Sequence, residues 1–285
     1  MRYLTEPGPE GRVDGERSGM TQLAVRRARS GLARVPALAV LQYYLVGYRR
    51  TWRGGVLSSF LLPTLTVLGF GVGVGALIDQ GVGGVSYLEW IVGGLLASTA
   101  LQVAITESSW PVYSSLQWTK IYFAQFAAPL RVADILAGQL AFVLFRVLAS
   151  ATAFLVVTGL LGALRSPWAV LALPVAALLG LAVAAPTFAY AATASSDSWL
   201  ALLFRFAVIP MTLFAGVFFP VESLPVGLRW LAYVTPLWHA VDLSRAATLG
   251  VPPVWSVTGH LLYLAAWVVG GWLLARRALG RKLVV

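Results

Sequence analysis

Six long apolar runs dominate the chain after residue 56, at approximately 57–78, 88–109, 138–161, 169–193, 200–219 and 257–275. Each run is close to the roughly 20 residues that a helix needs to cross a lipid bilayer. A spanning segment must satisfy its backbone polar groups internally, which favours helices. The pattern therefore predicts an all-α integral membrane protein, with six transmembrane helices in a domain over residues 57–275.

The residues before the first run divide into two parts. Residues 1–36 are polar and charged, which predicts a flexible cytoplasmic tail. Residues 37–56 have an apolar stripe that is too short to span, so we predict an amphipathic helix in the lipid headgroup region. The alternative is an extension of the first span. The stripe contains Leu38, Leu41, Leu45, Tyr48 and Trp52, with Gln42, Arg49 and Arg53 on another side.

Prolines interrupt the pattern between the fifth and sixth runs. Pro220 is predicted to end the fifth span, and Pro225 to begin a short helix that reaches about Val234. A second short helix is predicted from about Leu237 to a stop at Gly250. Neither is long enough to span. From the residues alone, a plain loop capped by prolines explains this segment equally well.

Charge predicts the orientation of the spans. Only 11% of the 285 residues are charged, against about 25% in soluble domains, and the mean hydropathy is +0.79. Residues 1–56 have a net charge of +6, and residues 276–285 form a basic tail with a net charge of +4. The positive-inside rule then predicts that both termini are cytoplasmic. Anionic lipid explains this basic excess better than nucleic acid does.

In this topology the segment 114–137 is cytoplasmic and the segment 220–250 is extracellular. The cytoplasmic segment has apolar residues interleaved with polar ones, which predicts a short amphipathic helix that ends before Pro129. A surface connector is the alternative interpretation. The candidate contact residues in this pattern are Lys120, Tyr122, Phe126, Leu130, Arg131 and Asp134.

Two sequence stretches resemble one protein family. YFAQFAAPLRVADILAG (122–138) and AGVFFPVESLPVGLRWLAYVTPLWHAVDLSRAATLG (215–250) are similar to membrane subunits of type-2 ABC exporters. The likeness covers roughly residues 40–280. It is strongest to the branch of nodulation-factor (lipo-oligosaccharide) and daunorubicin export permeases. Relatives often have an acid after the glycine that matches Gly138, whereas this chain has Gln139.

The resemblance implies a permease that forms a homodimer, binds two copies of a separate ABC ATPase through residues 114–137, and lies in the bacterial inner membrane. It implies that the exported compound is amphipathic or hydrophobic, either a drug or antibiotic or a lipo-oligosaccharide or glycolipid. It also implies that the two short helices re-enter the membrane from outside as a lid. The residues of that lid are Phe218, Phe219, Pro220, Glu222, Pro225, Pro236, His239, Asp242 and Arg245.

No nucleotide-binding motif accompanies these features. A P-loop needs a glycine-rich turn that ends in Lys-Ser/Thr, and neither Lys120 nor Lys282 has that context. GVGVG at 71–75 lies inside an apolar run, where close helix packing explains it better than dinucleotide binding. We therefore expect no cofactor in this chain, with ATP and Mg²⁺ bound by the partner subunit.

A few ionisable residues remain as candidates for chemistry. His239 and Asp242 are spaced to share a helix face, as a catalytic pair would be, but Asp242 and Arg245 could equally form a surface ion pair. With two histidines and no cysteine, an enzyme site is hard to assemble, and we predict no catalytic or metal-binding residues. A membrane enzyme or a passive channel without an ATPase is the alternative function.

Three charged residues lie inside the predicted spans. Glu107 and Arg146 are placed at similar depth, so they could pair, and Arg205 is a competing partner for the glutamate. A charge at the bilayer centre costs at least about 2.5 kcal/mol, so such residues face a partner or a watery path. The pair either holds two helices together or lines an inner vestibule.

Overall fold

The computed structural model describes residues 36–75 and 81–284, and over these ranges the protein is almost entirely helical. The prediction of an all-α membrane protein is confirmed. The β structure in these ranges is an isolated bridge between Val82 and Val85. The α-helices are α2 (Pro36–Thr66), α3 (Tyr87–Ser108), α4 (Trp110–Gln117), α5 (Ile121–Ala127), α6 (Val132–Leu160), α7 (Ala172–Thr193), α8 (Asp197–Leu203), α9 (Ile209–Phe214), α10 (Val226–Val234), α11 (Pro236–Leu249) and α12 (Val257–Leu283).

Short helices of other types join these elements. Two of them are π-helices, η1 (Val67–Val74) and η4 (Phe204–Val208), in which the backbone hydrogen bonds reach five residues back. Two are 3₁₀-helices, η3 (Pro167–Leu171) and η5 (Val221–Ser223). Because η3 continues into α7, and η4 joins α8 to α9, these short helices complete two of the long apolar segments.

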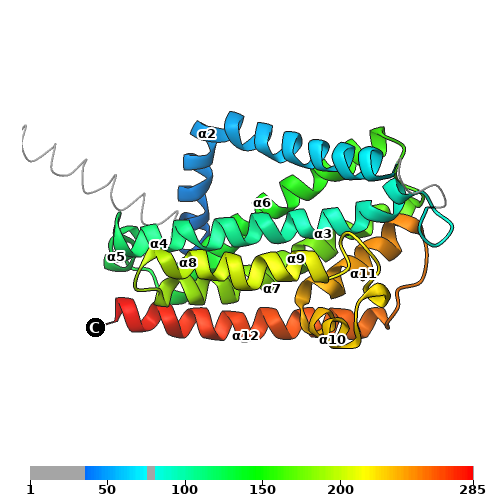
Figure 1. Cartoon of the computed structure of the whole chain (residues 1–285). Coiled ribbons are helices and arrows are strands. Elements are labelled where there is room, and N and C mark those ends of the chain that lie inside the picture. Colours follow the sequence, from blue (N-terminus) through cyan, green and yellow to red (C-terminus); the bar gives the residue numbers. More distant parts are fainter. Residues whose placement is uncertain (1–35, 76–80, 285) are drawn as a thin grey trace, which may run out of the picture.

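Five helical segments within the described residues are long and apolar enough to cross a membrane. They match the second to sixth apolar runs and lie side by side in Figure 1. The first predicted run is helical from residue 57 to residue 74, but residues 76–78 lie outside the described residues. The count of six spans therefore stays a prediction. The segments are Tyr87–Gln117, Val132–Leu160, Pro167–Thr193, Asp197–Phe214 and Val257–Leu283.

The predicted interfacial helix and the start of the first span are one continuous helix, α2. Figure 1 shows that α2 changes direction: its dark-blue start stands across the bundle, and the rest runs along the other long helices. Its start is held against α6, where Val40 is 2% exposed and a side chain on Gly138 would collide with it. The predicted tail at residues 1–36 lies outside the described residues, except for Pro36.

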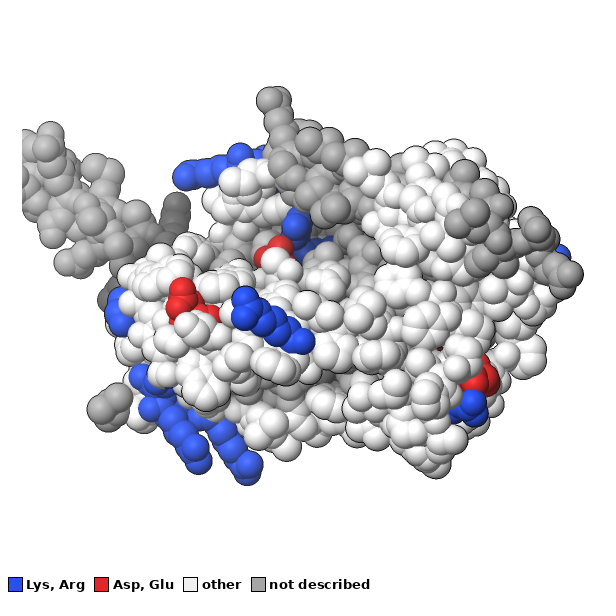
Figure 2. All heavy atoms as spheres, in the orientation of Figure 1, with Lys and Arg blue, Asp and Glu red and all other residues white. Residues whose placement is uncertain are grey.

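The two ends of the bundle carry different elements. The start of α2, the helix α5 and the C terminus share one end, while α10 and α11 lie at the other (Figure 1). The predicted partner-contact segment and the predicted lid are therefore at opposite ends. The predicted basic tail is helical as far as Leu283, because α12 continues through it. In Figure 2 most of the blue atoms gather at this C-terminal end.

Helix α3 is the central element, with α6, α7 and α11 packed around it. Its glycines allow the backbone of α11 to approach closely. A Cβ atom on Gly93 would lie 2.6 Å from the Cα of Arg245, so a larger residue would force the two helices apart. The close packing expected for GVGVG is found at Gly71, where a Cβ would meet the side chain of Leu88, whereas Gly73 faces open space.

Two predicted boundaries are wrong. The fifth span ends at Phe214 and not at Pro220, because residues 215–219 leave the helix and Gly216 has a φ of +78°, which favours glycine. The third span begins at Val132 and not at residue 138. Its polar first turn hides the start from a hydropathy pattern, and the Asp134 carboxylate accepts a hydrogen bond from the Arg131 backbone N–H at 2.9 Å.

Candidate functional site

Two short helices, α10 and α11, lie at one end of the bundle, with the boundaries that the prolines predict. Pro225 precedes α10, and Pro236 is the first residue of α11. The Thr235 side chain caps α11 by accepting a hydrogen bond from the Trp238 N–H. Gly250 ends α11 in the left-handed conformation, with a φ of +74°. The predicted helices are therefore present, and their re-entry into the membrane stays a prediction.

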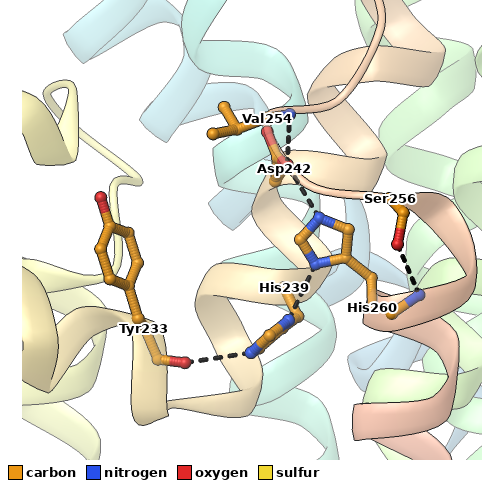
Figure 3. A network of polar contacts seen from close by, with 7 residues as sticks. Tyr233, His239, Asp242, Val254, Ser256 and His260 are labelled. Carbon is orange, nitrogen blue, oxygen red and sulfur yellow. Dashed lines mark hydrogen bonds and ion pairs between the residues drawn. The ribbon is translucent and has the colours of Figure 1, made fainter.

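A buried chain of polar contacts ties these helices to the last span (Figure 3). His239 Nε2 lies 3.0 Å from the backbone oxygen of Tyr233, and His239 Nδ1 lies 2.8 Å from His260 Nδ1. His260 Nε2 lies 3.0 Å from Asp242 Oδ2, which also accepts the Val254 backbone N–H at 2.8 Å. The chain thus connects α10, α11, the loop after α11 and the first turn of α12.

Burial controls the electrostatics of this chain. His239 is 2% exposed and His260 is fully buried, with Trp238, Trp255 and Tyr263 around the two rings. Burial, and then the neighbouring His260, lower the pKa of His239 to about 4. His239 is therefore neutral at physiological pH. The histidine–aspartate pair expected on one helix face is instead bridged by His260, which comes from another helix.

Arg245 fastens α11 to α3. Its guanidinium lies 3.9 Å from the centre of the Trp90 ring and donates to the backbone oxygens of Gly216 and Trp90, at 2.7 and 3.3 Å. Burial lowers its pKa to about 10, so it remains charged at neutral pH. The alternative prediction of an ion pair between Asp242 and Arg245 is not met, because the Asp242 carboxylate contacts His260 instead.

The other predicted lid residues lie between the fifth span and α10. Phe218 packs on Phe70 of η1 with ring centroids 4.9 Å apart, and its backbone oxygen accepts a hydrogen bond from the Tyr87 hydroxyl. Phe219 is half-buried against the core. Pro220 precedes the 3₁₀-helix η5, in which Glu222 is exposed. The phenylalanines therefore hold this segment to the bundle, and Glu222 faces outward.

At the opposite end, Glu107 and Arg146 form an ion pair beside a large cavity. Arg146 Nε lies 2.9 Å from Glu107 Oε1, and the guanidinium also lies 4.7 Å from the centre of the Tyr48 ring. The cavity has a volume of about 1070 Å³ and is lined by the first half of α2, by Phe142 and by this pair. In Figure 2 red and blue atoms lie together in a hollow of this face. The pair thus both joins two helices and lines a cavity.

Gln139 and Arg205 have different surroundings. Gln139 is buried, and its side-chain amide donates to the backbone oxygen of Glu107 at 3.4 Å, which links α6 to α3. Arg205 lies in the π-helix η4 of the fifth span and is exposed. Arg146, and not Arg205, is therefore the ion-pair partner of Glu107.

The predicted partner-contact residues do not share one outward face. Tyr122 is buried and contacts the Phe188 ring, and Phe126 and Leu130 are half-buried against the core. Arg131 is the N-cap of α6, and Asp134 lies in its first turn. The exposed residues include two of the predicted ones, Lys120, with a φ of +55°, and Arg131, together with Trp118 and Phe123, which are 62% and 40% exposed.

Sequence reasoning therefore missed several residues of these sites. His260 and Tyr48 complete polar contacts between elements that are distant in sequence, and Trp118 and Phe123 provide the exposed apolar surface near α5. One signal was available, because both histidines of the chain stand in the first turns of adjacent helices. Within the described ranges, no group of three histidine or acidic residues is placed to hold a metal ion.

Comparisons with known proteins agree with this architecture. A family model described as "ABC-2 type transporter" matches residues 37–249. "Nodulation protein J" of Rhizobium leguminosarum bv. viciae is 29% identical over 261 residues, which is 89% of this chain and 99% of that protein. "Nodulation protein J" of Rhizobium leguminosarum bv. trifolii is 28% identical over 247 residues, covering 87% of this chain and 94% of that protein. Rhizobium meliloti (strain 1021) has a similar protein of the same name, 27% identical over 247 residues, or 87% of this chain and 94% of that protein.

Proposed function

Because this chain belongs to the ABC-2 type transporter family, we propose that it is the permease subunit of an exporter driven by ATP hydrolysis on a separate ABC ATPase. Its cargo is an amphipathic or hydrophobic compound, of the drug or antibiotic class or the lipo-oligosaccharide or glycolipid class. The chain takes part as a dimer of two copies, bound to two ATPase subunits, in the bacterial plasma membrane with both termini in the cytoplasm.

The observation that supports this cargo is the cavity beside Glu107 and Arg146. Its wall combines aromatic and aliphatic side chains, such as Tyr43, Tyr48 and Phe142, with a few polar groups: the Glu107–Arg146 ion pair, Gln42, Arg50 and Thr51. Ligand sites typically combine apolar walls with a few polar groups that fix orientation. A molecule with a polar head and an apolar body fits such a wall, because both parts of it find matching surroundings.

The test is substrate-stimulated ATP hydrolysis and vesicle uptake by the permease–ATPase complex reconstituted in lipid. Tyr48→Ala removes an aromatic wall and the ring over Arg146, so we expect at least a tenfold higher substrate concentration for half-maximal stimulation, from about 1.4 kcal/mol of lost contact. Val156→Ala, at an exposed position of α6, is the matched control and should leave stimulation unchanged. Transport that continues without ATP would instead indicate a passive channel.

The fifth span provides the surface that we assign to the second copy. Helix α9 has no buried residue, and only 11% of the most apolar window of this span is buried within the chain, against 72% for Tyr87–Gln117. Exposed apolar residues lie before, within and after the π-helix η4, so a partner helix would find apolar surface along the whole span. A second copy would also shelter the exposed Arg205 from lipid, where a charge is costly. These residues are Leu202, Phe206, Ile209 and Leu213.

Cysteine cross-linking tests this dimer directly, because the chain contains no cysteine. Cysteines introduced singly at Phe206 or Ile209 should form disulfide-linked dimers in membranes, whereas a cysteine at Val156 should remain monomeric. Cross-linking at Val156 alone would place the second copy elsewhere. The same background tests orientation: a cysteine at Ser223 should react with an impermeant reagent in intact cells, and one at Leu283 should be protected.

A further inference from the structure

The polar chain between Tyr233 and Asp242 contains three contacts in a row, and each contact needs one hydrogen. The first joins His239 Nε2 to the Tyr233 backbone oxygen, the second joins the two Nδ1 atoms, and the third joins His260 Nε2 to the Asp242 carboxylate. A backbone oxygen can only accept, so the first hydrogen must be on His239 Nε2. A neutral His239 then presents a lone pair at Nδ1.

If His260 is also neutral, the three contacts lack one hydrogen. With an ionised Asp242, the third contact places a hydrogen on His260 Nε2, and a neutral His260 also presents a lone pair at Nδ1. Two lone pairs would then face each other across 2.8 Å, fully buried. Two neutral imidazoles bring two hydrogens to three contacts. All three contacts are satisfied when the cluster holds one additional proton, which also makes the cluster electrically neutral.

We propose that Asp242, His260 and His239 together form a binding site for one exchangeable proton, and that this proton fastens α11 to α12. His260 carries the proton as an imidazolium, donating to Asp242 through Nε2 and to His239 through Nδ1. His239 stays neutral and donates to Tyr233. This site is distinct from the proposed cargo cavity, and proton binding does not depend on the proposed export function.

The surroundings support this placement of the charge. Asp242 contacts His260 directly, and its second partner is the Val254 backbone N–H. The low pKa of His239, about 4, keeps a second proton off the cluster at neutral pH. Other ionisable side chains on and beside the packed elements include Tyr87 and Glu89 of α3, Glu222 of η5, Arg229 and Tyr233 of α10, Arg245 of α11, Tyr263 of α12 and Arg165, which lies 3.7 Å from the Glu89 carboxylate.

Most of these groups are engaged away from the two imidazoles. Arg245 is turned toward Trp90 and the Gly216 oxygen, and Glu89 accepts from Ser86. Tyr263 stacks on His239 with ring centroids 4.0 Å apart, while its hydroxyl donates to the Val234 backbone oxygen. Among the described contacts, the charge opposite the imidazolium is therefore that of Asp242.

The pH dependence follows from the proton count. Above pH 7 the histidines of an unfolded chain are mostly neutral, since their ordinary pKa is about 6.5. Unfolding then releases the bound proton, so the contact between α11 and α12 contributes stability that is present at lower pH and lost as the pH rises. The equilibrium constant for unfolding should increase about tenfold per pH unit until the cluster itself gives up the proton.

Nitrogen NMR of the purified, ¹⁵N-histidine-labelled permease in detergent tests the site without the ATPase or a substrate. At pH 7 we expect His260 to carry hydrogens on both ring nitrogens, and His239 to carry one on Nε2 alone. A neutral His260 at pH 7 would overturn the proposal. This measurement uses the unaltered chain, so it remains decisive even if the variants fold poorly.

Two variants sharpen the result. Asp242→Asn keeps the shape of the side chain but removes its charge, so His260 should lose the extra proton at a lower pH than in the unaltered chain. Tyr263→Phe is the matched control, because it removes the Val234 contact and leaves the proton count unchanged. It should lower stability equally at every pH. An unshifted proton release in Asp242→Asn would contradict the assignment, whereas failed export with normal proton binding would count only against the proposed function.

Discussion

Two acid–base pairs stand at opposite ends of this bundle and have very different surroundings. At the end that carries α10 and α11, which is the outer end in the predicted topology, Asp242 and His260 have side chains that are 10% and 0% exposed, and the acid has a backbone N–H as a second donor. At the other end, Glu107 and Arg146 have side chains that are 21% and 14% exposed, and they border a cavity of about 1070 Å³. The Asp242–His260 pair is enclosed by protein, while the Glu107–Arg146 pair borders a cavity.

The difference in burial indicates that the two charged pairs have different roles. A fully enclosed pair fixes the relative position of helices, since removing one partner leaves a charge with no solvent. A pair at a cavity wall can exchange part of its contact for a bound molecule at a smaller cost. In this chain the first pair therefore fixes α11 against α12, whereas the second pair leaves its cavity accessible.

The largest expected effect comes from breaking the enclosed pair. Asp242→Ala leaves the imidazole cluster without its counter-charge and the Val254 N–H without its acceptor, so we expect a loss of about 3–5 kcal/mol of stability. Thermal unfolding in detergent, followed by tryptophan fluorescence, measures it. Ser223→Ala, in exposed η5, is the control. A melting temperature unchanged by Asp242→Ala would show that the outer end is not held by this cluster.

A smaller effect is expected at the inner end, on partner binding. Trp118→Glu combined with Phe123→Glu places charges on the exposed apolar surface near α5, which should lower ATPase co-purification about tenfold or more. Leu160→Glu, on the most exposed apolar residue at the other end of α6, is the control for a general effect of added charge. Full ATPase binding by the double variant would leave the half-buried Phe126 and Leu130 as the remaining candidates.

The inner ion pair should have a still smaller effect on stability. Because it borders a cavity, we expect a coupling energy of about 1 kcal/mol between Glu107 and Arg146 in a cycle of Glu107→Gln, Arg146→Gln and the double variant. The same variants should change substrate-stimulated ATP hydrolysis more than they change the melting temperature. A coupling energy as large as the stability loss expected for Asp242→Ala, about 3–5 kcal/mol, would show that the two pairs do not differ in this way.

The smallest effect is expected from the prolines of the outer segment. Pro220→Ala with Pro225→Ala should change stability by less than about 1 kcal/mol, because the fifth span already ends at Phe214. Gly216→Ala should cost more, about 1–2 kcal/mol, since its φ of +78° disfavours a side chain and a Cβ would lie 2.9 Å from Val221 Cγ2. Export assays and melting temperatures compare the two. A greater loss in the proline variant would restore Pro220 as the helix stop.

Hydrophobic patterning predicted the helices well because apolar length and proline position are local properties. It placed α10 and α11 correctly from Pro225, Pro236 and Gly250. It misplaced the end of the fifth span, since the unusual φ of Gly216 has no hydropathy signal.

The contacts between distant elements were harder to predict. The pairing of Glu107 with Arg146 followed from similar depth in antiparallel helices. The meeting of His239 with His260, and the burial of Tyr122, depend on how helices rotate about their axes when they pack. A single sequence does not specify that rotation, so these contacts became visible only in three dimensions.

The π-helix η4 in the fifth span determines the direction in which the exposed residues after it, Ile209 and Leu213, point. In η4 the Ile209 N–H donates to the Phe204 oxygen, five residues back, and Pro210 has no N–H to restore the tighter pattern at the next position. One extra residue is therefore stored in this turn. If the turn tightened to an α-helix, everything after it would rotate by about 100° and shift by about 1.5 Å along the axis. Ile209 and Leu213 would then face a different neighbour. The π-turn therefore determines which residues of the fifth span's second half face outward from the bundle.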